Sequence, residues 1–250
     1  MSHPTVGIIL PRYGKVHPGS VVAAYEAVDP DAPPEDRVEV YCHRANTSSL
    51  LPGCFNRLLA YAYQLRDLGT ITHLAMIHDD IFPERYWLTK LWRIMRAHEA
   101  DVVSVCSPLK ETPFTDGGIR NRFSTGVGDI FDPWRNCKRH VTKQSVKDLP
   151  PTFGPEHVCG TDELLLINTG LWLADLRHPC WDSPMEGMPG SRFAFNILSC
   201  IETDADGNHH DFCIPEDFAW SRHLHHHGAR YVATTEVKLQ HYGDGVWTNH

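Results

Sequence analysis

The chain has 250 residues, long enough for one α/β domain with a substantial core, and its 42% hydrophobic and 22% charged residues are typical of a globular protein. The formal net charge of −8 argues against a protein whose whole surface binds nucleic acid. No apolar run approaches the roughly 20 residues of a membrane-spanning helix, and the first residues lack the pattern of a secretory signal, so we expect a cytoplasmic protein.

The eight cysteines are spread along the chain and form no CxxC pair. This spacing indicates neither a zinc ribbon nor a compact disulfide framework. We expect these cysteines to be reduced and mainly structural.

The N-terminal part of the chain alternates between strand and helix patterns. The segment TVGIILPRYG is a β-rich apolar run stopped by Pro11 and Gly14, and RVEVYCH is a second predicted strand. A short helix is expected in GSVVAAYEAV, followed by a loop in DPDAPPED. The stretch LPGCFNRLLAYAYQLRDLG has the apolar spacing of one helix face, with Pro52 near its start and Gly69 just past its end. This order predicts an α/β fold with a mostly parallel central sheet flanked by helices.

A third predicted strand, THLAMIH, ends in His78, Asp79 and Asp80. After it, Pro83 is expected to begin a helix, and DVVSVCS is the next strand. The inward stripe of that helix would be Trp87, Leu88, Leu91 and Met95. The three polar residues therefore sit at the carboxyl end of a parallel strand, where open α/β sheets bind ligands.

The second half of the chain is less regular. Residues 108–160 are predicted to be rich in loops, and ELLLINTGLWLADL is an apolar run interrupted by Asn168, Thr169 and Gly170. Helices are expected in SRFAFNILSCIE and in PEDFAWSRHLHHHG, and a strand in ARYVATTEV, which leads to KLQHYGDG. A single domain with an irregular middle insertion is the simplest interpretation.

Basic residues are concentrated in one part of this insertion. Between Ile119 and Asp148 there are seven Lys or Arg against three Asp, a local charge of +4. This segment is interpreted either as a solvated surface loop or as a local site for an anionic acceptor or phosphate group.

The adjacent Asp79 and Asp80 would repel each other at the mouth of a buried strand unless a positive charge joins them. A hard divalent cation with oxygen ligands would supply that charge, and such a cation usually also binds substrate phosphates. The alternative is a turn or helix cap.

Glu216 and Asp217 follow Pro215 at a predicted helix start, where the helix dipole favours carboxylates. They are interpreted either as simple capping residues or as the source of a general base that takes a proton from an acceptor hydroxyl. Further along this helix, His223 and His227 are one turn apart and could chelate zinc, but no third ligand is in view and a solvated helix face is favoured.

His241 follows a β-like run and precedes Gly243. A lone histidine is usually a packing or surface residue. Its place at the end of a strand makes it a candidate to complete a metal site begun by Asp80.

Taken together, these segments resemble the GT-A fold of nucleotide-sugar-dependent glycosyltransferases, particularly the family 2 group. The resemblance lies in six loose motifs in the right order over nearly the whole chain. They are VGIILPRYG, LPGCFNRLLAYA, LAMIHDDIFP (the DXD region), INTGLWLADL, PEDFAWSRHLHHHGARYV and QHYG. The family's QxxRW motif of processive synthases is absent, which favours single transfer over polymerisation. His78 stands where many members have a third aspartate.

The resemblance implies a single GT-A (Rossmann-like) domain with a nucleotide-sugar-binding half at 1–108 and an acceptor-binding half at 109–250, with a loop-rich basic segment at 109–160. It implies that Asp80 and His241 bind a divalent metal, Mn²⁺ or Mg²⁺. Asp217 would be the catalytic base, with Glu216 as its neighbour or substitute. The residues implied to contact the nucleotide or its ribose are Pro11, Arg12, Tyr13, Asn56, His78 and Asp79.

The expected reaction is transfer of a sugar from a nucleotide diphosphate sugar, with UDP favoured and GDP next, to an unidentified hydroxyl acceptor. An anionic acceptor is a slight preference from the +4 segment, and net charge does not favour nucleic acid. Two alternatives are a nucleotidyltransferase, for which LPRYGKVHPGS is only a faint triphosphate loop, and a non-catalytic nucleotide-sugar-binding module. The sequence does not distinguish retention from inversion of the sugar's configuration.

Overall fold

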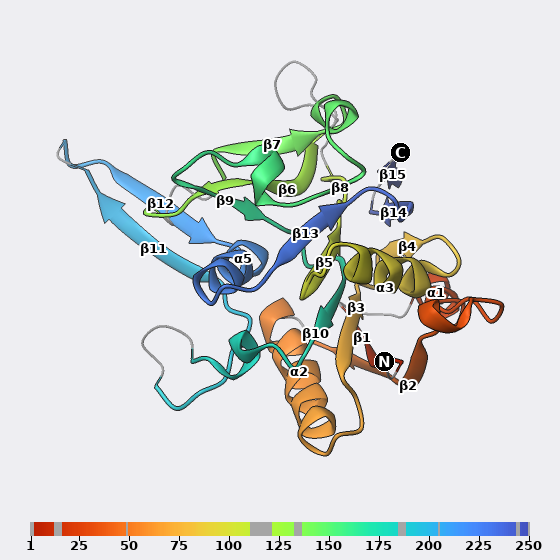
Figure 1. Ribbon diagram of the computed structural model, residues 1–250. Coiled ribbons are helices and arrows are strands. Elements are labelled where there is room, and N and C mark those ends of the chain that lie inside the picture. The colour runs from red at the N-terminus through yellow and green to blue at the C-terminus, as the bar shows by residue number, and fades with distance from the viewer. Residues whose placement is uncertain are drawn as a thin grey trace.

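The computed structural model describes residues 3–12, 17–48, 50–110, 122–132, 137–184, 189–204, 206–243 and 246–249. At its centre is a seven-stranded sheet in the order β2-β1-β3-β10-β5-β13-β8 (Figure 1). Its strands are β1 (Thr5–Arg12), β2 (Glu39–Thr47), β3 (His73–Ile77), β5 (Val102–Val105), β8 (Thr152–Phe153), β10 (Leu171–Asp175) and β13 (Tyr231–Thr234).

The central sheet is mixed. Strands β2, β1, β3, β5 and β13 run in one direction, whereas β10 is antiparallel to both β3 and β5, and β8 is antiparallel to β13. The α/β fold expected from the sequence is confirmed. Both halves of the chain contribute strands to this one sheet, so they build one compact domain.

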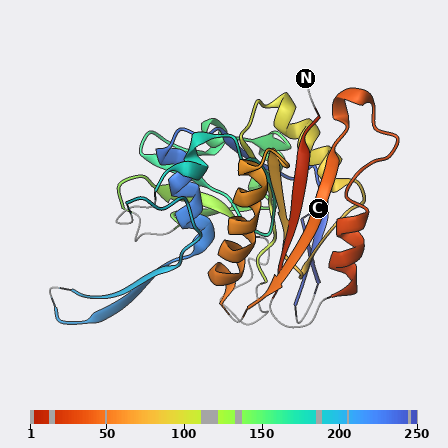
Figure 2. The same cartoon turned by 90° about the horizontal axis from the view of Figure 1, so that it is seen from below.

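Helices cover both faces of the sheet (Figures 1 and 2). They are α1 (Pro18–Tyr25), α2 (Leu51–Asp67), α3 (Trp87–Ala97), α4 (Pro155–Val158) and α5 (Glu216–His226), with 3₁₀ turns at Pro34–Asp36, Ser145–Asp148 and Pro179–Asp182. Helix α2 begins with a proline in its first turn and ends before Gly69, whose φ of 71° is the left-handed conformation that closes many helices.

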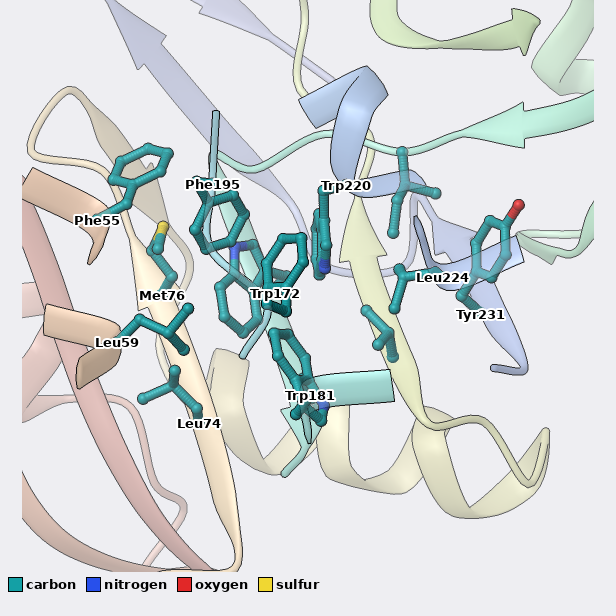
Figure 3. Packing of buried hydrophobic residues seen from close by; sticks show 14 of the residues in the cluster. Phe55, Leu59, Leu74, Met76, Trp172, Trp181, Phe195, Trp220, Leu224 and Tyr231 are labelled. Carbon is teal, nitrogen blue, oxygen red and sulfur yellow. The ribbon is translucent and has the colours of Figure 1, made fainter. Parts of the chain in front are cut away.

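The core has two layers because neighbouring strand residues point to opposite faces. On β3, Leu74 and Met76 pack with α2 and α5, whereas Ala75 and Ile77 pack with α1 and α3. In the first layer Trp172 of β10 lies between aromatic neighbours, with ring centroids 5.0 Å from Trp220 of α5 (Figure 3). This packing fixes α5 against the sheet.

Smaller sheets surround the central one. One contains β7 (Arg139–Thr142), β6 (Arg122–Asp129) and β9 (Glu163–Leu166), and another contains β15 (Val246–Thr248), β14 (Leu239–Tyr242) and β4 (Ile81–Pro83). The hairpin of β11 (Leu198–Thr203) and β12 (His209–Ile214) projects away from the body (Figure 2).

Three expectations from the sequence are wrong. The helix expected from Pro83 begins at Trp87, because residues 81–83 pair with β14 as β4. Residues 191–202 form no helix and instead lead into β11. The segment 108–160 contains β6, β7 and β8 within its described part. The interruption expected at Asn168–Gly170 lies between two strands of different sheets, β9 and β10.

Within the described part of the chain, no helix is both long and apolar enough to cross a membrane. All eight cysteines lie among these residues, and none forms a disulfide.

Candidate functional site at the carboxyl end of β3

The predicted acidic motif lies directly after β3. The His78 backbone N–H donates to the Gly170 carbonyl at 2.9 Å, because antiparallel β10 begins where β3 ends. The Gly170 N–H donates to Asn168 Oδ1 at 2.8 Å, and a Cβ on Gly170 would displace this side-chain oxygen. We call His78–Asp80, Asn168–Gly170 and Pro108–Lys110, the segment that follows β5, the β3 rim.

The carboxylate of Asp80 faces two basic side chains. Lys110 Nζ forms an ion pair with Asp80 Oδ2, and His241 Nε2 lies 3.5 Å from the same oxygen. His241 reaches this place because β14 pairs with β4, and the backbone N–H of Tyr242 donates to the Asp80 carbonyl at 2.8 Å. The structure thus brings together the two residues predicted as metal ligands.

The imidazole of His241 is oriented by its other nitrogen. Nδ1 lies 2.8 Å from the Pro108 carbonyl oxygen, which can only accept, so Nδ1 carries the proton. In the neutral ring Nε2 then presents a lone pair toward Asp80 Oδ2. Two acceptors that face each other require a cation or a second proton between them, and Lys110 supplies a positive charge to Oδ2.

The remaining atoms of this cluster are partly unsatisfied. Asp80 Oδ1 and His78 Nε2 are buried without a hydrogen-bond partner among the described residues. Burial lowers the pKa of His78 to about 4, so its ring is neutral. Burial alone would raise the pKa of Asp80, but the adjacent His241 imidazole and the hydrogen bond from the Lys110 ammonium hold it well below its usual range. Asp80 is therefore an ionised carboxylate whose buried Oδ1 has no hydrogen-bond partner among the described residues.

These donors fit a divalent cation in part. The lone pair of His241 and both carboxylate oxygens of Asp80 are suitable ligands, and the open Oδ1 is the kind of orphaned buried atom that an ion satisfies. Within the described ranges no group of three His, Cys, Asp or Glu gathers for a metal ion. An ion here would therefore complete its shell with phosphate oxygens or water, as Mg²⁺ commonly does.

The predicted nucleotide-contacting residues lie on the neighbouring part of this edge. Cys54 Sγ of α2 donates to the Asn46 carbonyl at 3.0 Å, and Asn46 pairs with Pro11, so the end of β1 lies beside the start of α2. The ring of Phe55 in α2 lies 5.1 Å from that of His78. Arg12 Nε is buried without a partner among the described residues, and Pro11 is buried in β1. Tyr13 lies outside the described residues.

Asn56 has a different environment from the one predicted. Its Nδ2 donates to the Phe195 carbonyl at 2.8 Å, and its Oδ1 accepts from the Phe195 N–H at 2.7 Å. Both ends of the amide are thus engaged by the backbone of the segment that precedes β11. In this structure Asn56 joins that segment to α2.

Glu216 and Asp217 begin α5, and they approach the β3 rim through Thr169. Thr169 Oγ1 donates to Glu216 Oε1 at 3.2 Å, and Asp217 Oδ1 accepts from the Phe218 N–H at 2.9 Å. Burial raises the pKa of Glu216. Burial, followed by the negative charge of Glu216, raises the pKa of Asp217 well above its usual range. Such a carboxyl is suited to taking up a proton.

The ion pairs of the +4 segment and the contacts of His223 in α5 give little support to an anion site or a zinc site. Lys138 Nζ pairs at 2.8 Å with Asp129, which is already counted in the +4 charge, and Arg139 pairs at 2.7 Å with Glu163 outside the segment, so Glu163 neutralises part of that charge. Arg120 and Arg135 lie outside the described residues. His223 Nε2 of α5 is hydrogen-bonded to the Cys180 carbonyl at 2.8 Å, and the ring centroids of His223 and His227 are 4.3 Å apart.

Two residues of the site were not singled out from the sequence. Lys110 lies five residues beyond the end of β5, at the same edge as Asp80, and a search for cations after each parallel strand could have found it. Thr169 lies in the Asn-Thr-Gly interruption of an apolar run, which was the available signal for a strand-end loop.

Comparisons with known proteins add little. No protein-family model matches the sequence, and a search of curated proteins returns no match. Among solved structures, the chain is similar to one described as "Crystal Structure of A197 from STIV", with a TM-score of 0.47 and 13% sequence identity over 96% of this chain and 86% of the other.

Proposed function

We propose that this chain is a glycosyltransferase that moves a sugar from a nucleotide diphosphate sugar, with UDP as the favoured nucleotide, to a hydroxyl acceptor. The observation that carries the proposal is the convergence of the Asp80 carboxylate and the His241 Nε2 lone pair beside the end of β3. The order of motifs that resembles the GT-A fold supports the same conclusion.

In this proposal Asp80 and His241 hold a divalent ion, Mn²⁺ or Mg²⁺, together with the diphosphate. When bound, the ion would stabilise the negative charge that grows on the leaving nucleotide. His78 and Asp79 lie beside this position, where they would orient the donor. Arg12 and Pro11 at the end of β1 would face the nucleotide.

Asp217 is proposed to take the proton of the acceptor hydroxyl in an inverting reaction. Its raised pKa makes it a better base than an exposed aspartate, because proton transfer is favoured when donor and acceptor are closer in pKa. Glu216, which is held by Thr169, keeps this pKa high through its own charge.

The test is an assay of nucleoside diphosphate release from UDP- and GDP-sugars with Mn²⁺ and a panel of hydroxyl acceptors. Asp80→Asn should lower the rate by a factor of about 100 or more, because an electrostatic contact that strengthens in the transition state is lost. Asp182→Asn is the matched control, because Asp182 is also ion-paired but contacts Arg66 of α2. NMR of the product would show whether the configuration is inverted.

The outcomes separate the alternatives. An active Asp80→Asn variant would contradict the proposal. Release of pyrophosphate from a nucleoside triphosphate would select a nucleotidyltransferase. Binding of nucleotide sugars with no turnover on any acceptor would select a binding module.

A further inference from the structure

Lys110 has a defined place at the β3 rim. Pro108 forms a β-bridge with Phe123, and the Leu109 N–H donates to the Arg122 carbonyl at 2.9 Å. The Pro108 carbonyl also receives the hydrogen bond of His241. The backbone that carries Lys110 is therefore tied to β6 and to β14, and its ammonium is directed at Asp80.

The ammonium uses the oxygen that a metal ion would need. Lys110 Nζ and His241 Nε2 both approach Asp80 Oδ2, so an ion held jointly by Asp80 and His241 would lie against the Lys110 charge. Two cations on one carboxylate oxygen repel each other, and this repulsion is weakly screened where the side chains are only partly exposed. The lysine side chain is 33% exposed, so it has solvent into which it can move.

We propose that Lys110 is the resident counter-ion of Asp80 and that it exchanges with the divalent cation, so that the ion binds only when the ammonium leaves Oδ2. This inference rests on the proposed function for the role of the ion. Without the ion, Lys110 keeps the charge of Asp80 balanced. With the ion, the lysine is released on its four-carbon stem beside the position proposed for the diphosphate.

The experiment is a titration of the full chain with Mn²⁺ alone, without nucleotide, followed by the EPR signal of the free ion. Lys110→Met should bind Mn²⁺ about three- to tenfold more tightly than the unmodified protein, because a competing ion pair of this exposure is modest in strength. Lys110→Gln should repeat the gain. Lys110→Arg, which keeps the positive charge, should stay within about twofold of the unmodified protein.

Two controls locate the effect. Lys90→Met removes another partly exposed lysine from an ion pair, that with Glu84 at 2.7 Å, and should leave Mn²⁺ affinity unchanged. Asp80→Asn should abolish binding at this site. Circular dichroism of each variant checks that it is folded.

The exchange is overturned if both neutral variants bind Mn²⁺ no more tightly than the unmodified protein, or if Lys110→Arg gains as much as Lys110→Met. It is also overturned if Mn²⁺ binds equally well to Asp80→Asn, or if neither the unmodified protein nor the Lys110 variants bind it. Because no nucleotide is present, a failure of sugar transfer alone leaves this result intact.

Discussion

At the scale of single residues, two acidic pairs of similar sequence have opposite environments. Asp80 lies beside Lys110 and His241, and its pKa is held well below the usual range. Asp217 lies beside Glu216 in a buried position, and its pKa is raised. The first carboxylate is therefore suited to binding a cation and the second to accepting a proton, a division that is common among paired catalytic acids.

Asp217→Asn should have opposite effects on stability and activity. A raised pKa in the folded protein stabilises the fold below the ordinary value of 3.8, and this contribution is lost as pH rises through the folded pKa. At neutral pH the ionised group therefore costs stability. The amide should raise the free energy of unfolding by about 0.5–2 kcal/mol, and it should lower kcat/KM by a factor of about 100 to 10,000.

Denaturant unfolding at pH 7 and steady-state rates measure these two effects. With Asp217 present, the transfer rate should rise with pH as Asp217 ionises, and this rise should be absent in Asp217→Asn. A destabilised Asp217→Asn protein would mean that the carboxylate is held by interactions that the structure does not show. An unchanged rate would remove Asp217 as the base.

At the scale of elements, the hairpin of β11 and β12 is nearly independent of the rest. Its strands pair with each other from Leu198↔Ile214 to Thr203↔His209, and it projects from the body (Figure 2). Only its base enters the core, through Ile214, which is 2% exposed. A two-stranded hairpin alone contributes little stability in water.

Replacing residues 200–212 by Asn-Gly should therefore leave the fold intact. Ser199 and Cys213 are cross-strand partners, and Asn-Gly closes such a pair with a tight turn. We expect the free energy of unfolding to change by less than about 1 kcal/mol, measured by denaturant titration. A loss of several kcal/mol would show that the hairpin is part of the core.

The elements that the sequence predicted well carry a complete local pattern. Helix α2 has Pro52 at its start, an apolar face and Gly69 at its end, and β3 is buried throughout, with an apolar run from Leu74 to Ile77. The region before α5 was predicted wrongly as a helix because its apolar residues were read with helical spacing. The stronger signal was the turn between β11 and β12, where Asp204 accepts from the N–H groups of Asp206 and Asn208 and Gly207 has a φ of 84°.

At the scale of the whole molecule, strand order decides which residues meet. The apolar run of β3 predicted that His78, Asp79 and Asp80 would lie at the carboxyl edge of the sheet. It did not predict that β10 would enter the sheet antiparallel beside β3, which places Thr169 between this edge and Glu216. It also did not predict that β14 would pair with β4 and deliver His241 to Asp80. The proximity of His241 to Asp80 was expected only from the strand-end position of His241 and the order of motifs, because the strand pairing that produces it joins residues far apart in the chain.

Because both halves of the chain build this edge, a ligand bound there should stabilise the entire fold. UDP and Mn²⁺ at about one hundred times their dissociation constants should add about 2.7 kcal/mol, which corresponds to a rise in Tm of roughly 5–10 °C for a chain of this size. UMP, which lacks the second phosphate, should give a smaller shift, and Asp80→Asn should lose most of it. An equal shift with UMP, or in Asp80→Asn, would place the nucleotide away from the β3 rim and contradict the diphosphate site.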